Sequence, residues 1–479
     1  MNNIKLTDLT KKIQNLEYGI SGEIEEIAAK LLASKNKIDP SFYLFPLNIG
    51  NPLELGQPSI SFVREVISAT LYPELLKSKD ISEDAKKRCS YYLSFFTFVH
   101  QIGAYSDNQG YDFVRKSVIS YIESRDGQAN CTIDDICLTE GGSLAIDYAC
   151  KMFLENQNDC ILLPRPEFPA YSALAKLAGG TPLFYNLQEE RKWQVDISEL
   201  EKIINDAKDQ GKQVKIMVVI NPGNPTGQVL SLESMQNLVK FCIEKRIVLF
   251  ADEVYQNNVY GSGMWVSFNK AITLLGTHYI KNLKSICLNS ASKGWLGECG
   301  MRGGYIVLRN FSEEIKTKIL TLTALYGINS VGQLFVELMC NPPMEGRESA
   351  ETVAKFKAET SIIATSLDVR RKLLIETLNS MKNIKCTDIQ GAFYGFPCIT
   401  MTKAAIGKAK EMGIEADMLY CQECLNETGI MTVPGSKFGQ KEGTYHFRIT
   451  NLIYDIEKFD IVMKKLKEFN DSFFEKYAD

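Results

Sequence analysis

The alternation of two patterns between residues 133 and 308 constrains the fold of this chain most. Short apolar runs, among them DCILLPRP (Asp159–Pro166), KIMVVI (Lys215–Ile220) and IVLFADE (Ile247–Glu253), are separated by amphipathic helical segments. Continuous apolar runs are typical of parallel strands buried on both faces, and helices between them are typical of crossover connections. We therefore predict an α/β fold, with a mostly parallel sheet flanked by helices.

Residues that can bind ligands follow these runs, at the predicted carboxyl ends of the strands. In open α/β sheets ligands bind at this edge, so side chains from distant parts of the chain can share one crevice. The pattern therefore predicts a single ligand site here. The residues concerned are Gly142, Ser143, Phe168, Asn224, Asp252, Tyr255, Ser290 and Lys293.

Lys293 follows the small residues Ser290-Ala291-Ser292 at the end of an apolar run, an unusual place for a solubilising charge. A lysine there would be partly desolvated, and desolvation favours the neutral amine that attacks carbonyls. The alternative is a surface lysine in a glycine-rich turn. This segment alone does not decide between the two interpretations.

Several other candidates also have both a ligand-binding and a structural interpretation. The Gly142–Ser143 turn offers N–H groups and a hydroxyl to an anion, although such turns also occur without ligands. Asp252 suits a protonated ring nitrogen or a strand-end cap, and Phe168 suits ring stacking or core packing. Arg448 lies on an apolar strand, where a buried arginine needs a carboxylate from a substrate or from the protein.

Composition excludes several classes of function. The net charge of −4 over 479 residues gives no electrostatic footprint for nucleic acid. No apolar run approaches the length of about 18 residues that a membrane span needs. The first 30 residues lack arginine and an apolar signal core, which favours a cytoplasmic protein over a secreted or mitochondrial one. We expect no nucleic-acid partner and no membrane association.

The thirteen cysteines are scattered along the chain, which predicts reduced and mostly buried thiols. Cys421 and Cys424 form a CxxC pair without a second pair to complete a metal site. The three histidines, His100, His278 and His446, have no ligand-like spacing. No metal site is therefore predicted.

The length, and a change of character after about residue 340, predict two domains. We expect residues 101–344 to form the large cofactor-binding domain, and residues 46–100 and 345–479 to form a smaller α+β domain. Residues 1–45 have the pattern of an N-terminal amphipathic arm, whose first 20 residues could pack on a partner subunit or be a frayed end. In detail, Lys77–Arg88 is predicted as a charged connector and Ala404–Thr428 as one long helix.

The order of the motifs resembles a known family. Asn-Pro-Gly-Asn-Pro-Thr-Gly (221–227), Asp-Glu-Val-Tyr (252–255) and Ser-Ala-Ser-Lys-Gly (290–294), with an arginine nine residues after the lysine, are similar to motifs of the class I/II aminotransferases of pyridoxal-phosphate-dependent fold type I. The resemblance extends over about residues 45–470. NIGNP, GAYSDNQG, PRPEFPAY and SKGWLGECGMRGGY resemble the alanine aminotransferase branch, which also contains glutamate:glyoxylate aminotransferases.

This resemblance implies roles for the candidate residues. Lys293 would carry pyridoxal 5′-phosphate as a Schiff base and move a proton, with Asp252 and Tyr255 completing the catalytic set. The implied cofactor-binding residues are Tyr105, Gly142, Ser143, Phe168, Asn224, Asp252, Tyr255, Ser290, Lys293 and Arg302. The implied substrate-binding residues are Gly50, Asn224 and Arg448. Tyr105 would reach the cofactor phosphate of a partner subunit, which implies a homodimer. Gly142 and Phe168 replace the commoner alanine and tyrosine, but both retain the groups that the function needs.

The implied reaction is the reversible transfer of the amino group of L-alanine to 2-oxoglutarate, giving pyruvate and L-glutamate. Glutamate:glyoxylate transamination and β-elimination are alternatives on the same fold. A non-catalytic sensing module of a transcription regulator is a further alternative, but no basic helix-turn-helix segment precedes residue 45. The sequence does not identify the group that recognises the distal carboxylate of glutamate. It also gives no physical account of Glu298 and Cys299 in the loop 297–300.

Overall fold

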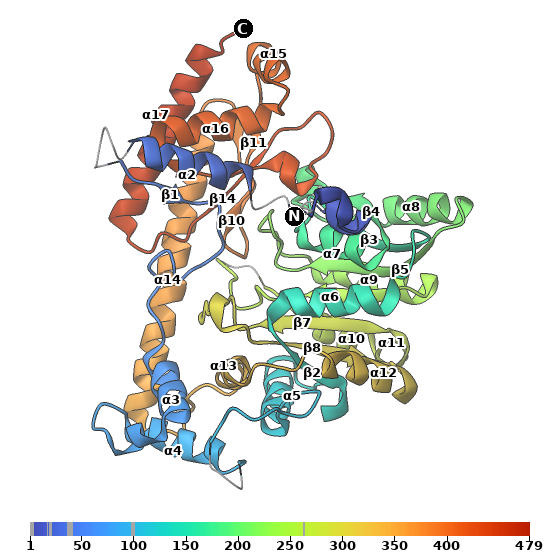
Figure 1. Ribbon diagram of the computed structural model, residues 1–479, viewed down its shortest axis with the longest axis vertical. Coiled ribbons are helices and arrows are strands. Elements are labelled where there is room, and N and C mark those ends of the chain that lie inside the picture. The colour runs from blue at the N-terminus through green and yellow to red at the C-terminus, as the bar shows by residue number, and fades with distance from the viewer. Residues whose placement is uncertain (1–3, 17, 19–21, 36–41, 97–100, 262–263) are drawn as a thin grey trace.

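The protein is described by a computed structural model that covers residues 4–16, 18, 22–35, 42–96, 101–261 and 264–479. Its central sheet has seven strands in the order β2-β8-β7-β6-β5-β3-β4 (Figure 1). Strand β8 is antiparallel to both neighbours, whereas the other neighbouring pairs are parallel. The predicted α/β fold with a mostly parallel sheet is confirmed. The strands are β2 (Ile136–Thr139), β3 (Asp159–Arg165), β4 (Thr181–Asn186), β5 (Gln213–Ile220), β6 (Val248–Asp252), β7 (Ser285–Ser290) and β8 (Gly304–Arg309).

Helices cover both faces of this sheet because successive strand residues point to opposite sides. In β6, Val248 and Phe250 belong to one apolar cluster, and Leu249 and Ala251 belong to the other. The first cluster includes residues of α6 (Gly141–Phe153), α7 (Ala170–Ala178) and α12 (Glu313–Ala324). The second includes residues of α5 (Asp112–Asp126), α8 (Ile197–Asp209), α9 (Leu232–Lys245), α10 (Phe268–Leu275) and α13 (Ser330–Cys340).

The C-terminal part is built around a long helix and small sheets. Helix α14 (Ala350–Ser380) is followed by a three-stranded antiparallel sheet with the order β10-β14-β13. Two short pairs accompany it: β1 with β12, and β9 with β11. The elements are β1 (Phe45–Pro46), β9 (Ile384–Lys385), β10 (Tyr394–Gly395), β11 (Cys398–Ile399), α15 (Lys403–Met412), α16 (Ala416–Thr428), β12 (Ile430–Met431), β13 (Val433–Pro434), η6 (Gly435–Phe438), β14 (Phe447–Thr450) and α17 (Ile456–Lys476).

The segment that precedes the seven-stranded sheet in the chain lies at the end of α14 that is away from the C-terminal helices. Figure 1 shows α3 (Ser61–Leu71) and α4 (Glu83–Leu93) beside one end of α14, and α15 to α17 around its other end. Near the first of these ends, Ser61 donates hydrogen bonds from its main-chain N–H and its hydroxyl to Glu359. Helix α14 thus extends from the helices α3 and α4 to the helices α15 to α17. The division of the chain into two domains stays a prediction.

The remaining elements are short. They are η1 (Leu6–Asp8), α1 (Lys11–Gln14), α2 (Glu23–Lys35), η2 (Pro73–Lys77), η3 (Ile133–Asp135), η4 (Glu189–Arg191), α11 (Thr277–Asn282) and η5 (Cys299–Met301). Parts of the predicted N-terminal arm lie outside the described residues. Among the described residues, none of the helices combines the length and the apolar composition of a membrane span.

Two sequence-based predictions of elements were wrong. The second half of the charged connector predicted for 77–88 is the start of helix α4. Ser82 caps this helix, and Asp84 and Arg88 are buried with partners in the chain after α13. The long helix predicted for 404–428 is two helices, α15 and α16. Gly413 ends α15 with φ +70°, a left-handed conformation that terminates helices.

Candidate active site

A cavity of about 270 Å³ lies where the carboxyl ends of the central strands meet β14, β10 and the segment after β1. Every residue implicated by sequence except Tyr105 lines this cavity. They are Gly50, Gly142, Ser143, Phe168, Asn224, Asp252, Tyr255, Ser290, Lys293, Arg302 and Arg448. The fold thus brings together side chains that are separated by almost 400 positions in the sequence.

Lys293 enters the cavity three residues after the end of β7. Its Nζ donates a hydrogen bond of 2.6 Å to the carbonyl oxygen of Gly50 and lies 3.9 Å from Cys299 Sγ. The amine is also 5.8 Å from the centre of the Tyr255 ring. Among the described residues no salt bridge joins this amine to a carboxylate, so the amine can react with a carbonyl group in the cavity.

Asp252 is the last residue of β6 and is only 5% exposed. Its carboxylate accepts hydrogen bonds from the Tyr171 hydroxyl at 2.8 Å and from the Val254 N–H at 3.3 Å. Burial raises the pKa of Asp252 to about 6, against the lowering effects of these hydrogen bonds and of the charge on Lys293. A cationic group in the cavity would compensate this burial, so the site suits a protonated ring nitrogen.

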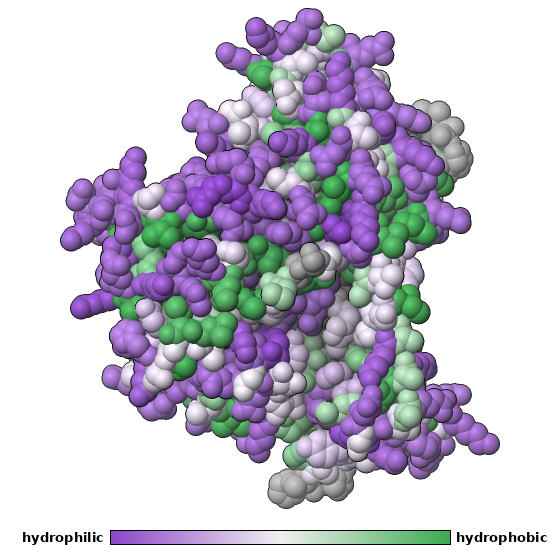
Figure 2. Space-filling model, turned by 180° about the vertical axis from the view of Figure 1, so that it is seen from behind, coloured by the Kyte–Doolittle hydropathy of each residue, from purple (hydrophilic) through white to green (hydrophobic). Residues whose placement is uncertain are grey.

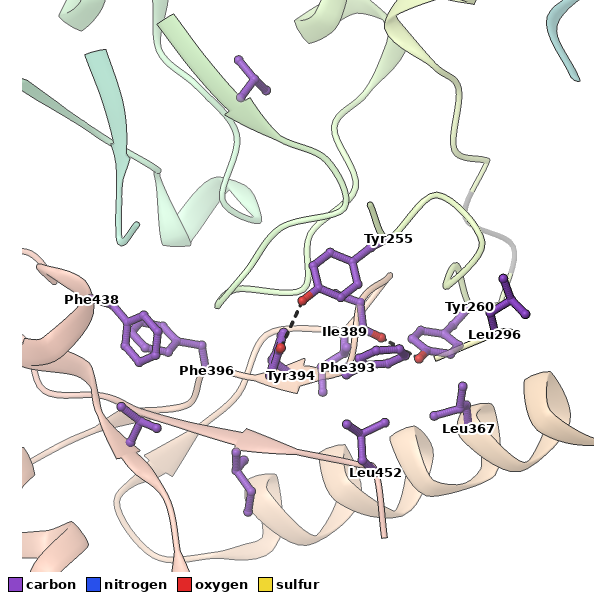
Figure 3. Packing of buried hydrophobic residues seen from close by; sticks show 14 of the residues in the cluster. Tyr255, Tyr260, Leu296, Leu367, Ile389, Phe393, Tyr394, Phe396, Phe438 and Leu452 are labelled. Atoms are coloured by element: carbon purple, nitrogen blue, oxygen red, sulfur yellow. Dashed lines mark hydrogen bonds between the residues drawn. The ribbon is translucent and has the colours of Figure 1, made fainter. Parts of the chain in front are cut away.

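Tyr255 and Tyr394 meet at the cavity wall with their hydroxyl oxygens 3.0 Å apart (Figure 3). Tyr255 follows β6, whereas Tyr394 begins β10. Burial raises the pKa of Tyr255 well above its ordinary value, with Tyr394 adding to the effect. Tyr255 therefore remains protonated at neutral pH and can donate a hydrogen bond to an oxygen in the cavity.

The start of α6 forms an anion-binding cradle with Arg302. Gly141 begins the helix with φ +74°, and a Cβ at this position would lie 2.6 Å from Arg302 Nη2. Glu140 at the N-cap makes no side-chain capping hydrogen bond, so the first N–H groups of α6 lack that partner. Ser143 and Ser290 line the same end of the cavity. Free helix N–H groups, hydroxyls and a guanidinium together suit a phosphate.

Arg448 is buried on β14 with 2% exposure and opens onto the cavity. It donates to Asn224 Oδ1 at 3.0 Å and to the carbonyl of Asn48 at 2.5 Å. Its Nε has no hydrogen-bond partner, and no salt bridge joins it to a carboxylate within the part of the chain that the structure describes. Tyr394 covers the guanidinium at 4.3 Å from the ring centre. A buried, unbalanced cation at a cavity suits a carboxylate ligand.

The loop 297–300, which the sequence left unexplained, is anchored by Glu298. This carboxylate is 2% exposed and forms an ion pair of 2.8 Å with Arg64 on α3. Cys299 Sγ donates to the carbonyl of Ser292 at 2.9 Å, and the Cys299 carbonyl accepts from Arg302 Nη1 at 2.7 Å. The loop therefore fixes the distance between Lys293 and Arg302 on either side of it.

Tyr105 is the predicted residue that the structure does not bring to the cavity, since its side chain is 97% exposed. Sequence reasoning also missed Tyr171, which orients Asp252, and Tyr394, which separates Arg448 from Tyr255. Tyr394 lies in the aromatic segment GAFYGFPCI, but nothing in that pattern indicates which ring faces a ligand. Tyr18 also lines the cavity, from the N-terminal segment.

Comparisons with known proteins agree with this site. The family model for aminotransferase class I and II matches residues 76–465. The chain belongs to the class I and II aminotransferases. It is 38% identical to a probable mitochondrial alanine aminotransferase of Dictyostelium discoideum, over 98% of this chain and 90% of the relative. It is also 38% identical to glutamate–glyoxylate aminotransferase 2 of Arabidopsis thaliana, over 98% and 96%.

A solved structure supports the fold of this aminotransferase. Alanine aminotransferase from Pyrococcus furiosus superposes with a TM-score of 0.76 at 24% identity and covers 97% of this chain and 100% of its own. Enzymes of the family use pyridoxal 5′-phosphate. The residues present fit this cofactor, because the cavity combines an amine, a buried carboxylate, a protonated phenol and a phosphate cradle.

Proposed function

We propose that this aminotransferase transfers the amino group of L-alanine to 2-oxoglutarate, giving pyruvate and L-glutamate. The observation that carries the proposal is Arg448, a buried cation without a carboxylate partner among the described residues, in the same cavity as Lys293. A guanidinium in that position suits the α-carboxylate that amino acids and 2-oxo acids share. The relative from Dictyostelium, named as a probable alanine aminotransferase, supports alanine as the donor.

We assign a role to each of the residues at the reacting end of the cavity. When bound, the cofactor withdraws electrons and so makes the Cα–H bond of the amino acid acidic. Lys293 Nζ is the base that removes this proton and returns it in the reverse direction. Asp252 would hold the positive charge of the ring nitrogen, and Tyr255 would donate a hydrogen bond to the phenolic oxygen, with Asn224 as a second partner. Gly50 leaves room for the substrate beside the lysine.

The remaining residues hold the two anionic groups. The first N–H groups of α6 at Gly142, the hydroxyls of Ser143 and Ser290, and Arg302 would bind the phosphate, while Phe168 would stack on the ring. Arg448 would bind the substrate carboxylate with Asn224 as its neighbour. Tyr394 keeps the guanidinium and the Tyr255 hydroxyl in place by contacts with both.

A profile of amino donors tests this proposal. We expect alanine to convert the bound cofactor to its amino form faster than other amino acids do, as followed by the loss of the visible absorption of the cofactor.

Lys293→Ala should abolish turnover, whereas the control Lys281→Ala, at an exposed position of α11, should not. Arg448→Lys should raise the KM for alanine by about tenfold to a hundredfold, because lysine cannot form the bidentate pair. Turnover of Lys293→Ala at the wild-type rate would contradict the assignment.

Glutamate:glyoxylate transamination is the second candidate. The Arabidopsis relative with that name is as similar to this chain as the Dictyostelium relative is. The donor and acceptor should therefore be varied independently. A higher kcat/KM for glyoxylate than for 2-oxoglutarate, with glutamate as the better donor, would favour this second function over the first.

We further propose a homodimer. Tyr105 is 97% exposed and lies beside Gly327, where an added Cβ would be 3.9 Å from its ring. Leu325, two residues before Gly327, is 77% exposed. Figure 2 shows apolar patches that interrupt the polar surface on one face. Large exposed apolar side chains of this kind support an interface between copies. Sedimentation should give twice the mass of the chain, and Leu325→Glu should lower that mass.

We also propose the cytoplasm as the location of this enzyme. The Dictyostelium relative is named as mitochondrial, so location has to be measured rather than transferred. Fractionation of cells that express the full chain with a C-terminal tag should place the activity in the cytosolic fraction.

A further inference from the structure

A second cavity, of about 330 Å³, lies where the ends of β3 and β4 face the segment that leads into β14. Glu189 and His446 line it, and Cys398 adjoins them. One ligand atom of each of these three residues lies within 4.8 Å of the ligand atoms of the other two. His446 is only 3% exposed and the other two residues are partly buried, so the cluster differs from a chance grouping of exposed polar side chains.

The backbone explains why Cys398 and His446 are neighbours. They form an antiparallel bridge, and the N–H of Ile399 donates to the carbonyl of Tyr445 at 2.7 Å. Directly opposed residues of antiparallel segments have their side chains on the same face, with Cβ atoms about 5 Å apart. Glu189 belongs to a distant part of the sequence and begins η4, shortly after the end of β4.

The hydrogen bonds around His446 identify which ring nitrogen carries the proton. Asp417 Oδ2 accepts hydrogen bonds from the Ser436 N–H at 2.6 Å and from Gln440 Nε2 at 2.9 Å. The Gln440 amide is thereby oriented with Oε1 toward His446 Nδ1, at 3.0 Å. Nδ1 therefore donates to this oxygen, and in the neutral imidazole the lone pair is then on Nε2.

That lone pair points at a negative group. Glu189 Oε2 lies 3.1 Å from His446 Nε2, so two electron-rich atoms would face one another across this distance. The contact is favourable only when a cation lies between them, either a proton or a metal ion. Cys398 Sγ, in the same cluster, is a third donor that a proton would not use but a metal ion would.

We propose that Glu189, Cys398 and His446 bind a divalent transition-metal ion of the Zn²⁺ type. A carboxylate oxygen, a thiolate and a neutral imidazole are donors that Zn²⁺ accepts together, whereas Mg²⁺ and Ca²⁺ prefer oxygen alone. The cavity beside Glu189 leaves room for water as the fourth ligand. Gln440 acts as the outer partner that fixes the imidazole, as is usual for metal-bound histidines.

The thiol also shows what binding requires. Burial, together with the negative charge of Glu189, raises the pKa of Cys398 to about 11. A metal ion therefore has to displace the proton of this thiol when it binds.

The site lies close to the active-site arginine. The Phe396 ring stacks on His446 with ring centres 4.8 Å apart. The rings of Phe396 and Phe438 lie side by side with centres 5.8 Å apart (Figure 3). The Arg448 guanidinium lies 4.8 Å from the Phe438 ring centre. Two aromatic rings thus separate the proposed metal from the residue that would bind the substrate carboxylate.

Co²⁺ titration of the chelator-treated holoenzyme tests the proposal. We expect one Co²⁺ per chain, with the sulfur-to-cobalt charge-transfer absorption and visible d–d bands of tetrahedral coordination, and displacement by Zn²⁺. Cys398→Ser should remove the charge-transfer absorption and weaken Zn²⁺ binding at least about a hundredfold. The matched control is Cys131→Ser, because Cys131 is also partly buried with a pKa raised to about 11, and it should bind like the wild type.

A second variant separates a built site from metal binding by any accessible thiol. Gln440→Leu leaves all three ligands in place but releases the imidazole, so Zn²⁺ affinity should fall about tenfold to a hundredfold. Circular dichroism would verify that each variant is folded. Equal affinity of the wild type, Cys398→Ser and Gln440→Leu, or the absence of stoichiometric Co²⁺ binding, would overturn the proposal.

Discussion

The charged form of Asp252 depends on a cation in the cavity. Its burial is unfavourable without a cation, and the raised pKa of about 6 expresses this. We expect Asp252→Asn to lower kcat by about a hundredfold or more, because a charge-assisted hydrogen bond contributes up to about 3 kcal/mol. Steady-state kinetics at saturating alanine would measure the loss. Activity equal to wild type would remove Asp252 from the cofactor site.

A methyl group added at Gly50 should disturb the position of the Lys293 amine. A Cβ there would lie 2.0 Å from the Tyr394 hydroxyl oxygen and 3.3 Å from Lys293 Nζ. We expect Gly50→Ala to lower kcat/KM about tenfold to a hundredfold, since overpacking costs about 1–3 kcal/mol. Adding Tyr394→Phe removes the hydroxyl and should restore part of the loss. If the double variant is no more active than Gly50→Ala, the contact with Tyr394 is not the cause.

Helix α4 is stabilised by an N-cap, Ser82, in a segment whose many charged residues led to the prediction of a connector. Ser82 Oγ accepts a hydrogen bond from the Ala85 N–H at 3.3 Å. Ser82→Ala should destabilise the protein by about 1 kcal/mol, the usual contribution of an N-cap, and lower the thermal midpoint. Ser90→Ala, at an exposed position in the same helix, is the control and should leave the midpoint unchanged. An equal effect of both changes would contradict the capping role.

For the molecule as a whole, buried carboxyls make stability depend on pH. Burial raises the pKa of Glu253 from 4.5 to about 7. The folded state therefore binds more protons than the unfolded state between these values, and the contribution of Glu253 to stability falls as pH rises through this window. Above it the loss approaches about 3 kcal/mol, at about 1.4 kcal/mol per pKa unit.

Glu253→Gln should consequently stabilise the protein at pH 8 and have little effect at pH 4.5. The amide oxygen can still accept from the Phe268 N–H, which lies 2.7 Å from Glu253 Oε1. Thermal unfolding of both proteins across this pH range would measure the difference. Glu244→Gln, which changes an exposed carboxyl on α9, should show no such dependence. A constant difference across the range would exclude titration of Glu253 as its cause.

The central sheet was predictable because its signal is local. Continuous apolar runs such as Lys215–Ile220 require burial on both faces, and the turn and helix signals between them leave one architecture. The same logic places Asn224, Asp252 and Lys293 at one edge of the sheet. Boundaries in the C-terminal part were less predictable, since Gly413 ends a helix through a left-handed conformation that the apolar pattern does not reveal.

The sequence by itself determined the fold class, the family and the residues at the strand ends, because each depends on short-range order. Tertiary structure decided what surrounds them. Only the fold sets Tyr394 between Tyr255 and Arg448, since packing between segments that are distant in the sequence leaves no periodic pattern in it. Likewise, the sequence predicted no metal site, because the three histidines have no ligand-like spacing and positions 189, 398 and 446 are far apart in the chain. Their convergence depends on a strand pairing and on a contact between distant segments, which only three-dimensional packing specifies.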